Sequence, residues 1–182
     1  MKRLPQYLSV VLLLAVSAAC GQTIVLNTDI FVASENEYIN QPGNNTIDVH
    51  SFLLNQGDDI VSCDGMKVFL WPVSRFTRDL ITGITGSEES GQRTVNNISE
   101  DVGTDKVKFL EDFITNYGRK QVCNSEGHAI FTGVPDGEYY LYLPFFWMGY
   151  HKNQELEKFA GIYIVDRIRV SRGQTLNHVM TR

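Results

Sequence analysis

The chain has 182 residues, of which 43% are apolar, enough for one core of ordinary size but not for two large domains. Its 16 basic and 21 acidic residues give a formal net charge of −5. Removing residues 1–19 takes away two basic residues and leaves −7. This acidic balance argues against nucleic-acid binding and against electrostatic attachment to anionic membranes.

The first 19 residues differ in character from the rest. Lys2 and Arg3 precede the apolar run 8–16, and small residues lead up to Cys20. The apolar run is too short to span a bilayer, and no stop-transfer pattern follows it. Residues 1–19 are therefore predicted to be a secretory signal peptide.

The end of this segment, "LAVSAACGQ", resembles the lipobox of bacterial lipoproteins, in which the cysteine is lipidated and anchors the mature chain. Ala18, Ala19 and Cys20 fit, but Ser17 stands where the family usually has leucine, so ordinary cleavage after Ala19 remains an alternative. Gly21 in place of aspartate favours the outer membrane, by resemblance to enterobacterial sorting. The resemblance implies an outer-membrane lipoprotein of the bacterial envelope that faces the periplasm.

The remaining chain reads as a short segment followed by one domain. Residues 20–46 hold one β-like run and an Asn-, Gly- and Pro-rich stretch, and are expected to be a tether or an edge strand. The domain spans 47–182. It begins with short strands that stop at Pro72, and the polar, aperiodic stretch 82–104 is predicted to be a surface loop.

One helix is predicted over 105–117, where apolar residues recur at helical spacing and Gly118 follows as a cap. The last third is β-rich, with strands expected at 128–133, 138–148, 161–171 and 175–181. "VPDG", residues 134–137, is predicted to close a hairpin, and "SRGQT", residues 171–175, to turn into the final strand. The pattern predicts a mainly β protein, an antiparallel β-sandwich with one inserted helix.

The cysteine count fits export. If Cys20 carries lipid, Cys63 and Cys123 form an even pair in an oxidising compartment, where a disulfide is the leading interpretation. Two free buried thiols remain an alternative. A metal site is disfavoured, because no histidine or cysteine lies at close ligand spacing to either residue.

The stretch "CNSEGHAIFTGVPDGEYYLYL", residues 123–143, resembles the signature of carboxypeptidase regulatory-like domains, a branch of the transthyretin-like (prealbumin-like) sandwiches. "FLLNQGDDIVSCDGMKVFLWPVSRFT" and "RIRVSRGQTLNHVMT" resemble the first and closing hairpins of these domains. The resemblance implies a prealbumin-like sandwich that places Cys63 and Cys123 ahead of neighbouring strands. It also implies a stabilising, spacing or protein- and sugar-binding role.

Catalytic patterns are missing from the sequence. It has no GxSxG, HExxH or P-loop motif. The C-terminus "NHVMTR" lacks the Tyr-Arg-Gly-Ser run of the urate-pathway hydrolase among transthyretin-like proteins. The histidines are scattered, unlike the iron ligands of intradiol dioxygenases, and the carboxylate pairs 58–59 and 88–89 are expected to be solvated. We therefore expect no catalytic residue, metal site or cofactor. The histidines are His50, His128, His151 and His178.

An aromatic-rich run around residues 139–151 exceeds what packing needs, and half of it would fall on an exposed strand face. The alternative is that helix 105–117 or the N-terminal segment covers it. An exposed aromatic face, together with the lipid anchor and the lack of catalytic motifs, favours a non-catalytic accessory subunit of a cell-envelope assembly. The other candidate function is a module that binds peptidoglycan or exopolysaccharide, with Trp71 and Trp147 as stacking platforms. The candidate binding surface comprises Trp71, Tyr140, Tyr142, Phe145, Phe146, Trp147 and Tyr150.

Overall fold

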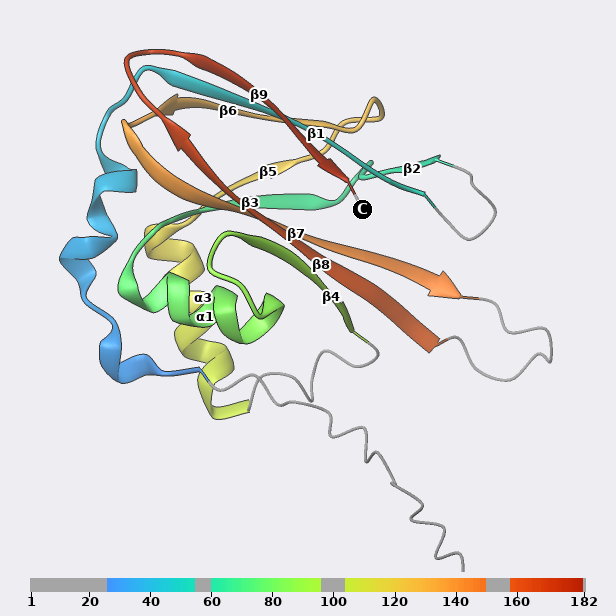
Figure 1. Ribbon diagram of the computed structural model, residues 1–182, viewed down its shortest axis with the longest axis horizontal. Coiled ribbons are helices and arrows are strands. Elements are labelled where there is room, and N and C mark those ends of the chain that lie inside the picture. Colours follow the sequence, from blue (N-terminus) through green and yellow to red (C-terminus); the bar gives the residue numbers. More distant parts are fainter. Residues whose placement is uncertain (1–25, 55–59, 96–103, 150–157, 182) are drawn as a thin grey trace, which may run out of the picture.

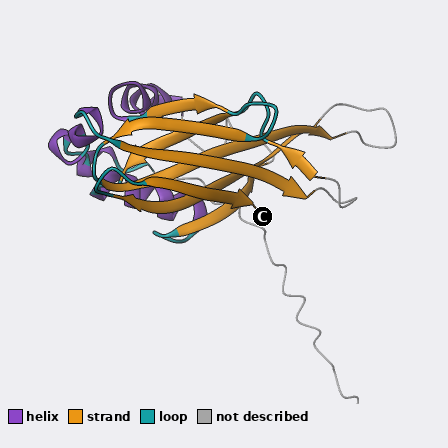
Figure 2. Cartoon of the chain, turned by 90° about the horizontal axis from the view of Figure 1, so that it is seen from above, coloured by secondary structure: helices purple, strands orange, loops and turns teal. Residues whose placement is uncertain are grey.

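The computed structural model describes residues 26–54, 60–95, 104–149 and 158–181, which form three layers (Figure 1). A four-stranded sheet stacks on a five-stranded sheet, and two helices cover the outer face of the five-stranded sheet. Figure 2 shows the helices gathered at one end of the molecule. The two stacked sheets confirm the predicted β-sandwich. No helix within the described residues is long and apolar enough to cross a membrane.

The four-stranded sheet is built around β1, which pairs antiparallel with β2 and β6 and parallel with β9. Along β1 the side chains alternate, so that Ile47 and Val49 face the core while Asp48 and His50 face outward. The strands are β1 (Asn45–Leu54), β2 (Ile60–Ser62), β6 (His128–Val134) and β9 (Thr175–Thr181).

The five-stranded sheet is antiparallel throughout and has the order β4-β8-β7-β3-β5. The middle of its long central pair, residues 139–145 of β7 and 163–165 of β8, is covered by the other sheet on one side and by the helices on the other. This explains the continuous apolar runs in both strands. The strands are β3 (Lys67–Pro72), β4 (Ser90–Val95), β5 (Arg119–Val122), β7 (Gly137–Gly149) and β8 (Lys158–Val170).

Helix α3 (Thr104–Tyr117) matches the predicted helix over 105–117. It ends where the Gly118 N–H donates to the Ile114 carbonyl, and a Cβ at Gly118 would come within 3.2 Å of Trp71 Cδ1. Gly118 therefore lets the end of the helix approach the sheet.

The prediction of a single helix and of a surface loop over 82–104 was wrong. Helix α1 (Arg75–Thr85) begins at a capping box, in which Ser74 and Thr77 satisfy each other's backbone N–H groups. It ends at Gly86 in the left-handed region with φ of 79°. Strand β4 follows after a short turn and forms an edge of the five-stranded sheet.

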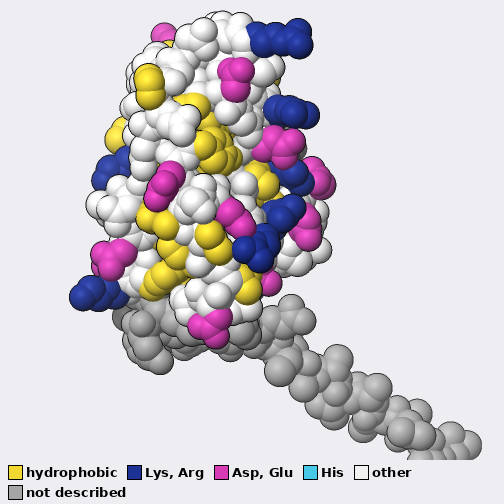
Figure 3. All heavy atoms as spheres, turned by 90° about the vertical axis from the view of Figure 1, so that its left-hand side faces the viewer, with side chains coloured by type: hydrophobic (Ala, Val, Ile, Leu, Met, Phe, Trp, Pro, Cys, Tyr) yellow, Lys and Arg dark blue, Asp and Glu magenta, His cyan; other side chains and the backbone are white. Residues whose placement is uncertain are grey.

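The described part of the N-terminal segment is neither a tether nor an edge strand. It forms three short 3-10 helices, and Leu26 and Ile39 are almost wholly buried. Arg119 donates to the Ile39 carbonyl, which fixes the segment against the start of β5. Figure 3 shows the side of the molecule on which this segment lies, with acidic and basic side chains interspersed over it. The helices are Thr28–Ile30, Ala33–Glu35 and Glu37–Asn40.

Two turns that the sequence assigned to hairpins instead carry the chain between the sheets. Strand β6, before "VPDG", pairs with β1, whereas β7, after it, pairs with β3 and β8 in the other sheet. After residues 171–174, β9 likewise leaves β8 for β1. The inward-facing side chains before and after the first turn were predicted correctly, and Phe131, Tyr139 and Leu141 are buried between the sheets.

The predicted disulfide is present. Cys63 follows β2 in one sheet and Cys123 follows β5 in the other, with their Cα atoms 5.7 Å apart. Both side chains are buried, at 0% and 2% exposure. The bridge therefore joins the ends of two edge strands, one from each sheet, inside the core.

Candidate binding cleft

The structure places most of the predicted aromatic surface inside the protein. Trp71 and Tyr140 are buried under the helices with Phe113 of α3, and Phe145 is buried between the two sheets. Tyr142 is half-buried and stacks on Trp71 with ring centroids 4.6 Å apart.

Trp71 and Tyr140 are therefore covered by the helix and the N-terminal segment, as the alternative interpretation predicted. Leu26 of that segment packs in the same cluster. Trp71, Tyr140 and Phe145 cannot form an exposed surface or a stacking platform. The side chains of Phe146 and Trp147, and all of Tyr150, lie outside what the structure describes.

A different site lies between the free edges of the two sheets. Strand β4 is the edge of the five-stranded sheet and β9 is an edge of the four-stranded sheet. A cleft of about 630 Å³ opens between them. The residues that line it have polar side chains, apart from Gly91: Glu89, Ser90, Gly91, Gln92, Asp166, Arg167 and His178.

The floor of the cleft is a polar interruption in two apolar strand faces. In β8, Asp166 is the one polar residue among the inward-facing positions Ile162, Ile164, Asp166, Ile168 and Val170. In β9, His178 lies between inward-facing Leu176 and Met180. Asp166 and His178 contact each other. Asp166 is only 7% exposed, and its Oδ2 lies 3.0 Å from His178 Nε2. A buried carboxylate needs such a partner, because burial without a hydrogen bond is costly.

Strand β4 supplies the outer wall of the cleft. Ser90 is opposite Asp166 and Gln92 is opposite Ile164, so both side chains project on the same face as Asp166. Both side chains are exposed. Exposed hydroxyl and amide groups therefore stand opposite the pair formed by buried Asp166 and half-buried His178.

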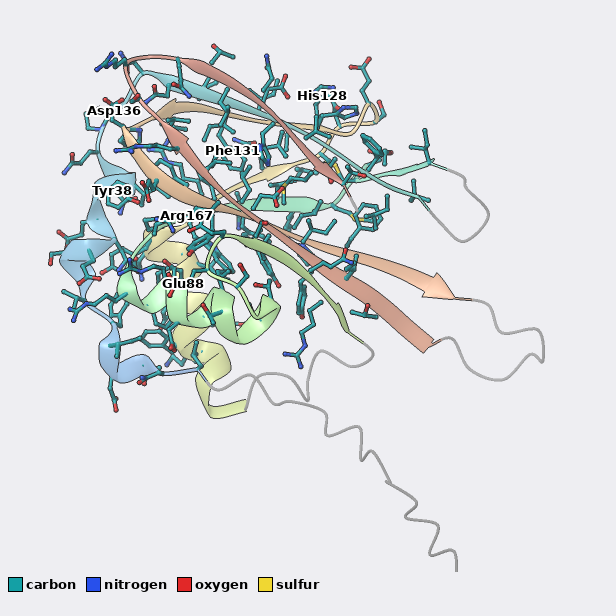
Figure 4. The ribbon with its side chains drawn as sticks, viewed as in Figure 1. Tyr38, Glu88, His128, Phe131, Asp136 and Arg167 are labelled. Carbon is teal, nitrogen blue, oxygen red and sulfur yellow. A yellow bond between two sulfur atoms is a disulfide. The ribbon has the colours of Figure 1, made fainter. Side chains whose placement is uncertain are left out.

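Arg167 holds the rim of the cleft in place. Its guanidinium pairs with Glu89, with Nη1 2.7 Å from Oε1, and with Glu138. The Arg167 N–H donates to the Glu89 carbonyl at 2.8 Å, and the Tyr140 hydroxyl donates to the Glu88 carbonyl at 2.7 Å. Figure 4 shows Arg167 and Glu88 near each other beside α1. The turn before β4 is thus fixed by β7 and β8.

These contacts also perturb one carboxyl group. The hydrogen bond from Arg167 lowers the pKa of Glu138 below its usual value. Glu89, which was predicted to be an ordinary solvated carboxylate, also pairs with Arg167. Both anionic partners of Arg167 are satisfied within the protein, so the rim is organised before any ligand arrives.

The cleft was not predicted from the sequence. Its signal was present in β8 and β9, where Asp166 and His178 occupy inward positions among aliphatic residues. Among the described residues, no three His, Cys, Asp or Glu side chains gather to hold a metal ion. Two described histidines, His128 and His178, pair with a carboxylate. Within the described residues, neither imidazole hydrogen-bonds a Ser, Thr or Cys side chain that could act as a nucleophile.

Comparisons with known proteins show the fold. No protein-family model matches the chain, and no curated protein matches it. Among solved structures it is similar to PA1324, a proposed carbohydrate-binding protein of Pseudomonas aeruginosa, at 18% identity and a TM-score of 0.61, covering 84% of this chain and 97% of that one. It also matches GBS52, a minor pilin of Streptococcus agalactiae, at 13% identity and a TM-score of 0.35, over 75% of this chain and 42% of that one.

Proposed function

We propose that the chain is a non-catalytic binding module and that its cleft between β4 and β9 binds a glycan. The observation that carries the proposal is the polar cleft itself, in which amide, hydroxyl, carboxylate and imidazole groups converge. Such groups can donate to and accept from neighbouring hydroxyls of a sugar ring. A few well-placed polar groups in a concave site are typical of small-ligand recognition.

The fold comparison supports the same ligand class. PA1324, whose fold this chain shares, is described as a proposed carbohydrate-binding protein. The accessory-subunit hypothesis depended on the lipid anchor, the lack of catalytic motifs and an exposed aromatic surface, and of that surface Trp71, Tyr140 and Phe145 are buried. We therefore place glycan binding ahead of a role in an envelope assembly. The membership in the carboxypeptidase regulatory-like domains, inferred from motifs, stays a prediction.

Calorimetric titration of peptidoglycan fragments and neutral oligosaccharides tests the cleft. Asp166→Asn should weaken binding about tenfold to a hundredfold, because a hydrogen bond to a charged group contributes roughly 1.5 to 3 kcal/mol. Gln92→Ala should cost about threefold to tenfold, the value of one neutral hydrogen bond. Calorimetry is preferable to tryptophan fluorescence, since Trp71 is buried away from the cleft.

The matched control is Asp48→Asn. Asp48 forms a similar pair with His128, at 2.7 Å, on the outer face of the other sheet. Its substitution removes the same charge from the protein but should leave glycan affinity unchanged. Equal losses in the Asp48 and Asp166 variants, or no heat with any glycan, would count against the cleft.

We also propose that the protein is exported and held at the outer membrane through Cys20, facing the periplasm. The Cys63–Cys123 bridge supports export, because disulfides persist in oxidising compartments. Cys20→Ser should abolish lipid labelling and move the protein from the membrane to the soluble fraction. Ser17→Leu, which restores the usual lipobox residue, should keep it in the membrane. Unchanged fractionation of Cys20→Ser would refute the anchor.

A further inference from the structure

Two imidazole rings stack on the outer face of the four-stranded sheet, which the helices do not cover. His50 of β1 and His128 of β6 are direct partners across the antiparallel pair. Their ring centroids are 4.5 Å apart and their planes differ by 3°. Phe52 flanks His50 at 5.4 Å. Figure 4 marks His128 near one end of this sheet, above the five-stranded sheet and the helices.

The hydrogen bond to Asp48 fixes the state of one ring. Asp48 Oδ1 lies 2.7 Å from His128 Nδ1. A carboxylate only accepts, so Nδ1 carries a hydrogen, and in the neutral ring Nε2 presents a lone pair. The His50 ring makes no hydrogen bond within the described part of the chain. The two half-exposed rings therefore offer two neighbouring nitrogen donors.

We propose that His50 and His128 bind a divalent transition-metal ion of the Cu²⁺, Ni²⁺ and Zn²⁺ class. Imidazole nitrogen suits these ions, whereas Ca²⁺ and Mg²⁺ prefer oxygen. Asp48 is a positioning residue, because a carboxylate that holds the other ring nitrogen orients a metal-ligating histidine and raises its basicity. No group of three candidate ligands occurs among the described residues, so water completes the coordination shell.

Binding requires a small rearrangement of the rings. In parallel planes the two lone pairs do not converge on one point. Asp48 holds the His128 ring, whereas the half-exposed His50 ring can turn about its side-chain bonds until its nitrogen approaches an ion at His128 Nε2. His50 and His128 are far apart in the sequence, which is why their spacing predicted no metal site; the pairing of β1 with β6 brings them together.

Copper titration of the tag-free mature protein tests the site, read by electron paramagnetic resonance. His151 lies outside the described residues, so every variant carries His151→Ala. The parent should show two nitrogen donors, and His50→Ala or His128→Ala should each leave one. Asp48→Asn should weaken affinity about tenfold to a hundredfold while keeping both nitrogens. Competition with Zn²⁺ should displace Cu²⁺ only at excess, since Cu²⁺ binds more tightly.

His178→Ala is the matched control, because His178 is also paired with a carboxylate but stacks on no second imidazole among the described residues. It should leave the copper signal unchanged. The proposal fails if the His50→Ala/His128→Ala double variant binds Cu²⁺ as tightly as the parent, or if two nitrogens remain in both single variants. Equal thermal stability of the parent and the variants ensures that lost binding is not lost folding.

Discussion

Replacing both bridged cysteines by alanine, Cys63→Ala/Cys123→Ala, should lower the free energy of unfolding by about 2 to 5 kcal/mol. The bridge closes a loop between residues 60 positions apart, which restricts the unfolded chain. It also ties the ends of β2 and β5, edge strands of different sheets, at a point where both sulfurs are buried. Alanine keeps the site apolar, so the loss reports the cross-link rather than a buried polar group.

Urea unfolding followed by circular dichroism measures this loss. Reductant in the unfolding buffer should destabilise the parent to a similar extent and have no effect on the double alanine variant. That second result separates the bridge from general effects of the reductant. Two titratable thiols in the denatured parent protein, or identical unfolding midpoints for parent and variant, would show that the bridge is absent.

The sequence predicted which strand residues face the core better than it predicted strand partners. The alternation through Phe131, Tyr139 and Leu141 encodes the buried face, and all three are buried. It does not encode which strand lies alongside. A short turn such as "VPDG" fits a hairpin and a crossing between sheets equally well, and only the packing of the whole chain selects the crossing.

Helix α1 and strand β4 were missed for different reasons. In α1 the apolar positions Phe76, Leu80 and Ile84 follow helical spacing behind a Ser74 cap, so the signal was present among many Thr and Arg residues. In β4, "SGQRTV" has no apolar alternation. The inner side of β4 faces the cleft rather than the core. Polar cleft-lining residues such as Ser90 and Gln92 therefore stand where a core strand would have the apolar residues that identify it.

The aromatic run of β7 shows how composition can mislead about a surface. An excess of aromatic residues on both parities suggested one buried and one exposed face. Tyr140 and Phe145 face opposite layers, and both are buried, because β7 is a central strand covered by the helices on one side and by the second sheet on the other. Two-sided burial is a property of strand order, which the sequence did not reveal.

Tyrosine ionisation should unfold the protein in alkaline solution. Burial raises the pKa of Tyr38 and of Tyr140 to about 12, and raises that of Tyr139 further. The ordinary value in an unfolded chain is about 10. The folded state therefore holds these protons more tightly. Its advantage is complete below pH of about 10 and is lost as the pH rises from about 10 to about 12.

The loss should be about 2 to 3 kcal/mol for Tyr38 and for Tyr140, since one pKa unit corresponds to about 1.4 kcal/mol. Each hydroxyl donates to a backbone carbonyl: Tyr38 to Glu138, Tyr139 to Pro135 and Tyr140 to Glu88. Ionisation removes those bonds and leaves a charge among apolar neighbours. Their combined contribution is comparable with the whole stability of a typical domain.

Urea unfolding at pH about 8 and about 11, with tyrosinate absorbance recorded in parallel, measures this effect. Tyr140→Phe should be less stable than the parent at the lower pH, where the bond to the Glu88 carbonyl is lost. It should also lose less stability on going to the higher pH, because one shifted group is gone. Unfolding free energies that match at the two pH values, or nearly full tyrosinate absorbance in a still-folded protein at pH about 11, would contradict the burial of these hydroxyls. Because Tyr140 also holds the turn before β4, its ionisation should release the rim of the cleft along with the core beneath the helices.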